Sequence, residues 1–314
     1  MRLDSQQPGF HAAHCRLFAL IFLLASCVCI PQKDIVMSST GQIESPQGIV
    51  NGCAEGGFGD DGEDFSQTEL GALSISVLNW NILKGDRRSW NKDFQSISSK
   101  MDLLLIQEAY LNENVLDGIN GAQMGWVFSP SFFYAANNVP TGVLTASHAQ
   151  PIYCRALRAR EPIIRTPKSS LITKYRLTGE NQVLLVANVH AINFSLGARS
   201  YKSQAFALKQ EMQSHPGPII LAGDFNTWSE KRLQSLHEVT EQLGLQPVQF
   251  PTDHRKKVFK KAVDHIFYRG LTVANARVLR VRSSDHNPML VEFRLSRSRS
   301  GVDPPSSQAS RGID

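Results

Sequence analysis

An acid and an amide stand two residues apart where a hydrophobic run of the chain ends. Residues 219–222 are Ile-Ile-Leu-Ala, a run typical of a strand that is buried on both faces. Asp224 and Asn226 follow it and share one side of the extended chain, because side chains alternate along a strand. A carboxylate in this position can orient and deprotonate a water molecule. A turn into a helix capped by Thr227 or Ser229 explains the same residues without any chemistry, so both interpretations stay open at this point.

Hydrogen-bonding or acidic residues end other apolar runs in the same way. They are Asn81, Glu108, His190, Asn193, Asp264, Asp285 and His286. One such residue alone marks no more than the point where a strand meets water, and a single histidine is most often held in a local hydrogen bond. Six endings of the same chemical kind, counted with the one at Asp224, instead predict that these strand ends meet in one site.

Together these side chains supply the parts of a metal-assisted hydrolysis of a phosphate ester. The oxygens of Asn81, Glu108 and Asp285 are hard ligands that suit Mg²⁺, with Mn²⁺ as the alternative. An imidazole such as His286, held by a second acid, can donate a hydrogen bond to a phosphoryl oxygen that gains charge in the transition state. Further fixed donors are His190, Asn193 and Asn226. The sequence contains no P-loop, and no Ser or Cys nucleophile stands beside a base.

The elements that must hold these residues are mostly strands. Apolar runs predict strands over 72–82, 101–110, 125–134, 141–149, 168–177, 181–194, 219–222, 262–270, 271–281 and 288–295. Helices are predicted over 93–100, 200–214 and 228–243. This order lacks the strict strand–helix alternation of a doubly wound fold. It predicts an α/β chain of the α+β kind, in which a two-sheet β-sandwich is flanked by helices.

The chain is long enough for one large domain. It has 314 residues, of which 42% are apolar, and it can bury a sizeable core. We predict the domain over 70–296, after a leader over 1–27 and an acidic, Gly-rich linker over 28–69. A polar, disordered tail over 297–314 follows it.

The leader is typical of an export signal. Arg2 and Arg16 precede the apolar run LFALIFLLAS, which is short for a membrane span but suits the core of a signal peptide. The segment LASC, which ends at Cys27, resembles the lipobox of bacterial lipoproteins, in which the leader is cut before the cysteine and the cysteine is acylated. We therefore expect an exported or lipid-anchored protein of the bacterial cell envelope. The alternatives are an uncleaved anchor, or a cytoplasmic protein that begins at Met37.

The cysteines carry little further information. They are Cys15, Cys27, Cys29, Cys53 and Cys154. Their spacing matches neither a zinc site nor a disulfide framework. Apart from Cys27, they are expected to be small buried or exposed thiols.

Positive charge is concentrated in the predicted domain. The whole chain has a net charge of +5, but segment 28–69 holds eight acids and one lysine, and the leader and tail are each +1, which leaves +10 on residues 70–296. A basic domain suits a polyanionic or phosphate-bearing substrate. The basic run 255–261, expected to lie outside the reacting groups, fits a nucleic-acid backbone, anionic lipid headgroups or a solvated surface. Aromatic residues are not interleaved with it in the way that a groove for stacking single strands requires.

The motifs occur in a familiar order. NWNI, LLLIQEA, NVHAINF, LAGDFNTW, VDHIFYRG and SSDHNPML resemble the motifs of the endonuclease/exonuclease/phosphatase superfamily over essentially all of 72–295. That superfamily includes deoxyribonuclease I, abasic-site endonucleases, neutral sphingomyelinases and inositol polyphosphate 5-phosphatases. The resemblance implies the four-layer fold of deoxyribonuclease I. The intervening text, including REPIIRTPKSSLIT, looks most like a bacterial branch of the superfamily.

The resemblance also implies a metal centre and a base. Glu108 matches the principal Mg²⁺ ligand of the family, with Asn81 and Asp285 in or near the shell of the metal. Asp224 matches the carboxylate that activates the attacking water, and Asn226 the amide that positions this water.

The remaining motif residues match the groups that face the phosphate. Asp264 matches the acid that orients His286, which itself contacts the scissile phosphate. His190 and Asn193 match a His/Tyr-x-x-Asn motif. Abasic-site endonucleases carry an acid where this chain has Leu83, and a tyrosine where it has His190. The site therefore looks more like that of deoxyribonuclease I or a sphingomyelinase than that of an abasic-site repair enzyme.

These features lead us to expect a Mg²⁺-dependent hydrolase of phosphodiester bonds, most simply a nuclease, that works as a monomer. A phospholipid or phosphosugar phosphodiesterase or phosphatase is the first alternative, and a lipid anchor would place it beside membrane lipid. A binding module that has kept the fold and lost the chemistry is the second. Retention of every acid, histidine and amide of the motifs argues against the second alternative.

Overall fold

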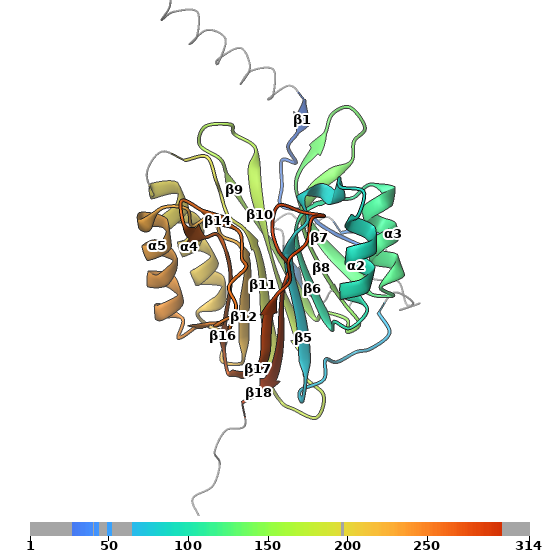
Figure 1. Ribbon diagram of the computed structural model, residues 1–314, viewed down its shortest axis with the longest axis vertical. Coiled ribbons are helices and arrows are strands. Elements are labelled where there is room, and N and C mark those ends of the chain that lie inside the picture. The colour runs from blue at the N-terminus through green and yellow to red at the C-terminus, as the bar shows by residue number, and fades with distance from the viewer. Residues whose placement is uncertain (1–26, 40, 44–48, 52–64, 196–197, 297–314) are drawn as a thin grey trace, which may run out of the picture.

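Two β-sheets pack face to face at the centre of the protein, and two helices cover the outer face of each (Figure 1). The computed structural model describes residues 27–39, 41–43, 49–51, 65–195 and 198–296. Helices α2 (Trp90–Ser98) and α3 (Glu113–Gly121) lie on one sheet, and α4 (Arg199–Met212) and α5 (Glu230–Gln242) lie on the other. This layer order confirms the predicted four-layer sandwich of the deoxyribonuclease I type.

The first sheet has the strand order β17-β18-β5-β6-β8-β7-β2-β3, with β1 beside β7. Its strands are β1 (Val28–Cys29), β2 (Val36–Ser38), β3 (Gly41–Ile43), β5 (Ile75–Asn81), β6 (Leu103–Tyr110), β7 (Gly125–Tyr134), β8 (Pro140–Ser147), β17 (Leu271–Val278) and β18 (Met289–Leu295). A short 3₁₀ helix, η1 (Leu83–Gly85), follows β5. Because β5 and β6 are parallel, their carboxyl ends, and with them Asn81 and Glu108, lie at the same edge of the sheet.

The second sheet has the order β13-β16-β12-β11-β10-β9-β4. Its strands are β4 (Ile49–Asn51), β9 (Tyr153–Arg160), β10 (Pro167–Arg176), β11 (Val183–His190), β12 (Ile219–Asp224), β13 (Gln246–Pro247) and β16 (Asp264–Arg269). The register places Asp224 of β12 between His190 of parallel β11 and Asp264 of antiparallel β16. A small hairpin of β14 (Lys257–Val258) and β15 (Lys261–Ala262) precedes β16.

The central strands are apolar on both faces because each lies between two layers. In β12, Ile220 packs between the sheets, whereas Ile219 and Leu221 pack against helices α4 and α5. In the first sheet, Leu105 of β6 packs between the sheets, and Leu104 packs toward α2 and α3. The apolar runs of the sequence therefore lack alternation for the physical reason expected of covered strands.

The structure differs from the expected linker over 28–69. The described parts of this segment add β1, β2 and β3 to the first sheet and β4 to the second. Val36 is fully buried, and the ring of Phe65 fills the space above Gly125, where a Cβ atom would lie 2.5 Å from the ring. Strands of two or three residues among glycines and acids show no periodicity, which is why the pattern did not reveal them. Most of the expected leader and all of the expected tail lie outside the described residues.

One cysteine also differs from expectation. Cys154, fully buried on β9, is disulfide-bonded, so the prediction of a thiol is wrong there. Cys27 and Cys29 are exposed, and neither is disulfide-bonded. A single bridge leaves no spacing pattern in the sequence, unlike the repeated pairs of a disulfide framework.

Within the residues that the structure describes, no helix has the length and apolar character needed to cross a membrane.

Candidate active site

A β-bulge sets Glu108 at the edge of the first sheet. The register between β6 and β8 shifts here, so that Gln107 and Glu108 together oppose one residue of β8. Glu108 has a φ angle of 51°, a left-handed conformation that costs a non-glycine residue on the order of 1–3 kcal/mol. Its Oε1 lies 3.3 Å from Asn81 Nδ2 and 3.7 Å from His190 Nε2. The strained residue thus carries its carboxylate to the facing sheet.

A close approach of two strands places Asp224 at the end of β12. A Cβ atom on Gly223 would lie 1.9 Å from Val189 O, so only glycine allows this approach. Asn226, at a φ angle of 49°, donates its backbone N–H to Asp224 Oδ1 (3.0 Å) and its Nδ2 to Ala191 O (2.9 Å). The chain thus turns at Asn226 instead of continuing as the extended strand we expected. Asn226 holds the carboxylate of Asp224 through its backbone.

The helix that follows begins without the expected side-chain cap. Ser229 occupies the N-cap position of α5 but forms no side-chain capping hydrogen bond. Thr227 Oγ1 lies 2.7 Å from Ala262 O and 2.8 Å from His265 Nε2. Thr227 therefore links the segment after β12 to β15 and β16.

Asn81 joins the two sheets at their common edge. It is 1% exposed, and its Nδ2 donates to Glu108 Oε1 at 3.3 Å and to Asp224 Oδ2 at 3.1 Å. Its Oδ1 accepts from the backbone N–H of Leu83 at 3.1 Å, and its backbone oxygen accepts from Ser284 Oγ at 2.7 Å. One amide therefore fixes a carboxylate from each sheet.

His286 and Asp264 form a buried acid–imidazole pair. His286 Nδ1 lies 2.9 Å from both carboxylate oxygens of Asp264, and its Nε2 faces Asp224 Oδ2 at 3.9 Å. Trp80 Nε1 donates to the backbone oxygen of His286 at 2.9 Å. Nδ1 is therefore committed to Asp264, and Nε2 points toward the cluster of predicted residues.

Charge and burial oppose each other in this cluster. Burial by itself lowers the pKa of His286, but the carboxylates of Asp264 and Asp224 outweigh it and raise the pKa to about 10. Burial raises the pKa of Asp224, and the negative charge of Asp264 adds to the effect, although His286 opposes it. The ring of His286 is thus a cation at neutral pH, and Asp224 is a stronger base than an exposed aspartate.

His190 lies between the two carboxylates. It is 3% exposed, and its Nε2 is 3.7 Å from Glu108 Oε1 and 3.6 Å from Asp224 Oδ2. Sequence reasoning missed Lys168, whose Nζ lies 3.0 Å from the same His190 nitrogen and 4.0 Å from Glu108 Oε1. Lys168 is the first residue of KSSLIT, at the start of β10, and no local pattern distinguishes it from an exposed lysine.

Asn193 lies beside this cluster. Its Oδ1 accepts from Trp228 Nε1 at 2.9 Å, and its backbone N–H donates to Glu161 Oε1 at 2.5 Å. Within the described part of the chain, the recorded contacts of its side chain do not reach the other predicted residues. Asn193 is therefore a neighbour of the site on the side of Trp228.

A buried arginine on α5, Arg232, is hydrogen-bonded to the loops that follow β11 and β12. Sequence reasoning missed this residue. Arg232 is 1% exposed and donates to the backbone oxygens of Ile192 (2.7 Å), Asn193 (2.7 Å) and Asn226 (3.1 Å). Its guanidinium group also lies 4.4 Å from the ring centre of Trp228. In the sequence, Arg232 looks like one charge of a polar helix, because Ile192 and Asn193, two of its partners, are more than 30 residues away.

The basic run 255–261 is closer to the site than expected. Lys256 Nζ lies 2.7 Å from Asp285 Oδ2, so the prediction that this loop stays outside the reacting groups is wrong for Lys256. Most of its other charges are also paired: Lys257 with Asp253, and Lys261 with Glu230. The run is thus held by carboxylates, a feature of tertiary contacts that a count of charges cannot reveal.

This geometry agrees with comparisons with known proteins. The sequence pattern described as the Endonuclease/Exonuclease/phosphatase family matches residues 78–286. The chain belongs to this family. The resemblance drawn from the motifs is thereby confirmed.

Relatives and solved structures of the family support the assignment. The chain is 41% identical over 234 residues to a UPF0294 protein of Erwinia tasmaniensis, a match that covers 72% of this chain and 83% of the relative. An endonuclease/exonuclease/phosphatase structure from Beutenbergia cavernae has a TM-score of 0.57 at 14% identity, and covers 71% of this chain and 72% of that one. The human Nocturnin catalytic domain with bound sulfate has a TM-score of 0.55 at 18% identity. That match covers 73% of this chain and 97% of the Nocturnin chain. The two structures share the fold with this chain.

Members of the endonuclease/exonuclease/phosphatase family use divalent metals, and the donor set here fits one. Glu108 and Asp224 supply hard carboxylate oxygens, and the Asn81 amide faces both. Ligand-type atoms of Asp224, Asp264 and His286 also lie within 4.8 Å of one another, but His286 Nδ1 is bound to Asp264. The oxygens around Glu108 are therefore the better place for a hard cation.

Proposed function

We propose that this member of the endonuclease/exonuclease/phosphatase family is a Mg²⁺-dependent hydrolase of phosphodiester bonds, and most simply a nuclease. The observation that carries the proposal is the placement of Asp224 Oδ2, which lies within 3.9 Å of both His190 Nε2 and His286 Nε2. A base beside the imidazolium ring of His286 suits a water that attacks a phosphate held by that ring.

Each residue then has a defined task. Asp224 takes a proton from the attacking water as the water oxygen bonds to phosphorus, the bond from phosphorus to the leaving ester oxygen breaks, and the leaving oxygen takes a proton from solvent. His286, a cation held by Asp264, donates a hydrogen bond from Nε2 to a phosphoryl oxygen as negative charge builds on it. Neutral His190 lies on the same side, beside Lys168. Glu108 would hold the metal, with Asn81 and Asp285 as the further predicted ligands, and a metal there would supply a positive charge to the phosphate.

A nucleic acid fits the surroundings of this site. Trp228, which holds Asn193, makes an edge-to-face contact with Phe259, whose exposed fraction is 79%. Phe194, next to Asn193, is 51% exposed. Aromatic faces beside a phosphodiester site suit stacked bases. Phe259 itself lies within the basic run 255–261.

A lipid phosphodiesterase is the second candidate. Phe259 and Lys260 lie at the tip of the β14–β15 hairpin, with left-handed φ angles of 48° and 66°. An exposed aromatic residue next to a lysine also suits the surface of an anionic membrane. The two candidate functions use the same catalytic groups. They differ only in whether the exposed residues around the site, such as Phe259 and Lys260, contact nucleic acid or membrane lipid.

A screen of the purified protein tests both candidates. Plasmid, single-stranded DNA, RNA, sphingomyelin and inositol phosphates are each incubated with the protein and Mg²⁺, with Asp224→Asn as the matched control. We expect cleavage of nucleic acid that the control lacks. Hydrolysis of sphingomyelin alone favours the second candidate, and no turnover of any phosphoester contradicts the proposal.

We also propose that the protein is exported, with Cys27 as the lipidated residue. Cys27 is exposed directly before β1 and is not disulfide-bonded, and the disulfide at Cys154 suits an oxidising compartment. A chain that begins at Met37 would lack β1, which pairs with β7. Palmitate labelling of the wild type but not of Cys27→Ala is the expected result. An unlabelled wild type in the cytosolic fraction would instead support the start at Met37.

A further inference from the structure

A basic hollow lies beside the loop that carries His286. It has a volume of about 550 Å³, and its lining residues are His254, Arg280, Val281, Arg282 and Asn287. Among the residues that the structure describes, no acid lines this hollow. The lining comes from the loop between β17 and β18 and from the segment before β14, and the residues assigned to the reaction are not part of it.

The two arginines point to the exposed side of their loop. Burial alternates along 279–282, because Leu279 and Val281 pack against the hydrophobic cluster between the first sheet and helices α2 and α3. Arg280 and Arg282 face the other way, and both are exposed. Arg280 Nη2 lies 3.3 Å from His254 Nδ1, which places its guanidinium group at the hollow.

Asn287 fixes the hollow to the catalytic loop. Its Oδ1 accepts the backbone N–H of Val281 at 3.1 Å, and its Nδ2 donates to His254 O at 2.6 Å. This side chain thus joins the two segments that line the hollow. Because Asn287 directly follows His286, the arginines keep a fixed position relative to the imidazole that we assign to the phosphate.

The positive charge of the two arginines is not neutralised by their surroundings. Within the described part of the chain, neither Arg280 nor Arg282 forms an ion pair with a carboxylate. Asp253 and Asp285, which flank the hollow in the sequence, are already paired with basic side chains at 2.8 and 2.7 Å. Arg87 adds a further guanidinium group to the loop, since its Nη1 donates to Arg282 O at 2.8 Å. The hollow therefore favours an anion.

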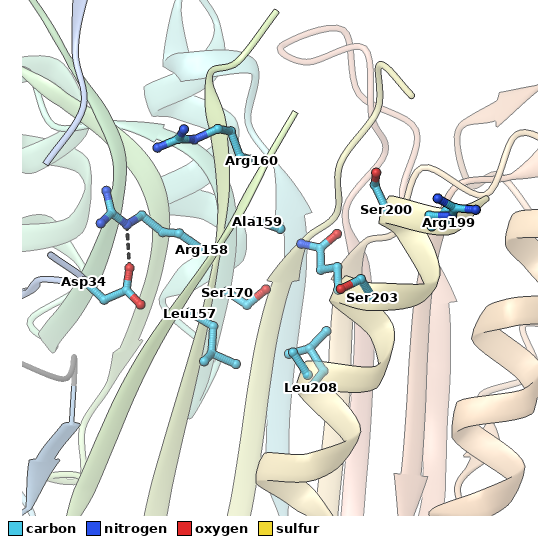
Figure 2. Close-up of a pocket in the computed structure, with 12 residues that line it drawn as sticks. Asp34, Leu157, Arg158, Ala159, Arg160, Ser170, Arg199, Ser200, Ser203 and Leu208 are labelled. Carbon is cyan, nitrogen blue, oxygen red and sulfur yellow. Dashed lines mark hydrogen bonds and ion pairs between the residues drawn. The ribbon is translucent and has the colours of Figure 1, made fainter. Parts of the chain in front are cut away.

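A cavity of similar volume, about 530 Å³, lies between β9, β10 and α4 but lacks this character (Figure 2). The guanidinium group of Arg158 is paired there with Asp34 at 2.6 Å. Figure 2 shows Arg199 extending away from the cavity. Unpaired positive charge thus distinguishes the hollow beside His286.

We propose that this hollow binds a backbone phosphate of a nucleic acid, on the same strand as the phosphate that is cleaved. Guanidinium groups bind phosphate oxygens through paired hydrogen bonds, and a polyanion gains from several such contacts at once. A membrane surface fits less well, because none of the large apolar residues exposed on the described chain lines the hollow. The inference rests on the proposed function and names its substrate class, a strand with at least two phosphates.

Binding of a fluorescent oligonucleotide to the full chain in EDTA tests the hollow apart from turnover. The double variant Arg280→Gln/Arg282→Gln is compared with Arg277→Gln/Arg294→Gln, which removes the same charge from exposed positions of β17 and β18 outside the hollow. Fluorescence anisotropy gives the affinity at several salt concentrations. We expect the first variant to bind about tenfold more weakly or worse. Its slope of log affinity against log salt should be flatter by about 1.4–1.8, which is two lost contacts at about 0.7–0.9 each.

Two results of the binding experiment would overturn the proposal. The first is an equal affinity and an equal slope in the two double variants. The second comes from vesicles of phosphatidylserine and phosphatidylcholine as the alternative probe. If Arg280→Gln/Arg282→Gln loses vesicle binding and keeps oligonucleotide binding, the hollow serves a membrane instead. Circular dichroism spectra show that both double variants are folded.

Kinetics with Mg²⁺ separates this inference from the proposed function. KM is measured for the oligonucleotide and for a diester with a single phosphate. Arg280→Gln/Arg282→Gln should raise the ratio of the first KM to the second about tenfold, and the control pair should leave the ratio unchanged. An unchanged ratio in the active double variant overturns the inference. If the wild type cleaves neither substrate, the proposed function fails, and the anisotropy result alone decides whether the hollow binds nucleic acid.

Discussion

Lys168 extends its ammonium group to His190, with 3.0 Å between Nζ and Nε2. The pKa of His190 lies well below its ordinary value, because the ring is buried and because Lys168 and His286 carry positive charge nearby. A neutral imidazole can accept from the ammonium group at Nε2, which leaves its proton on Nδ1. The same ammonium group lies 4.0 Å from Glu108 Oε1. Lys168 thus brings a fixed cation to the place where we expect phosphate oxygens.

Lys168→Met should therefore lower kcat by about 10²–10³, the usual loss for a group that stabilises charge in the transition state. Lys168→Arg should retain part of the activity. Lys174→Met is the matched control, because Lys174 lies on the same strand and contacts the ring of Tyr153. Steady-state kinetics on a single phosphodiester gives the measurement. Equal kcat values for Lys168→Met and the control would exclude Lys168 from the reaction.

The acid–imidazole pair predicts a graded series of losses. Asp224→Asn and His286→Ala should each lower kcat on the order of 10²–10⁴, because each loses a group that acts on the reacting atoms. Asp264→Asn should lower kcat by less, since Asp264 acts through His286. Circular dichroism spectra confirm that each variant is folded. Wild-type activity in Asp264→Asn would contradict the pairing.

Glu108→Gln should abolish Mg²⁺-dependent turnover with little loss of stability. The side chain is 25% exposed and lies at the edge of the sheet, so folding does not depend on its charge. Glu113→Gln on the nearby helix α3 is the control, since Glu113 is exposed. Mn²⁺ affinity, measured by calorimetry, should fall in Glu108→Gln alone. Full activity of this variant at low Mg²⁺ would remove Glu108 from the metal site.

The sequence predicted the ends of strands well, because each ending is a local pattern. An apolar run that stops at Asn81 or Asp224 shows both the strand and the polar side chain at its edge. The residues that support those ends were not predicted. Arg232 and Lys168 acquire their roles only when segments more than 20 residues away fold against them.

A buried network between the sheets shows the same limit. Gln107 Nε2 donates to Asn79 Oδ1 at 2.9 Å and to Asn188 Oδ1 at 2.7 Å, and Asn188 Nδ2 donates to Leu144 O at 2.8 Å. These amides lie within apolar strands, where a single polar residue gives no sign of its partners. Their pairing requires the two sheets to meet in one register, which sequence patterns do not contain.

His265, which sequence reasoning passed over in VDHIF, predicts how stability depends on pH. Burial lowers the pKa of His265 to about 3, and the positive charge of Arg255 adds to this effect. Nε2 lies 2.8 Å from Thr227 Oγ1 and 3.2 Å from Ala262 O, and Nδ1 faces Arg255 Nη1 at 3.4 Å. A ring that donates from Nε2 and accepts at Nδ1 is neutral, and a second proton would meet the guanidinium group.

Above about pH 6.5 His265 is neutral in both the folded and the unfolded chain, so it adds no pH dependence. As the pH falls from about 6.5 toward 3, the unfolded chain binds a proton here and the folded chain does not, so the free energy of unfolding falls. His265→Gln should therefore reduce this slope by up to about 1.4 kcal/mol per pH unit. Urea unfolding at several pH values between 4 and 7 gives the slope for both proteins. The comparison cancels the contributions of other buried histidines such as His215, whose pKa burial also lowers. An identical slope in wild type and His265→Gln would show that the folded protein accepts a proton at His265 as readily as the unfolded chain does.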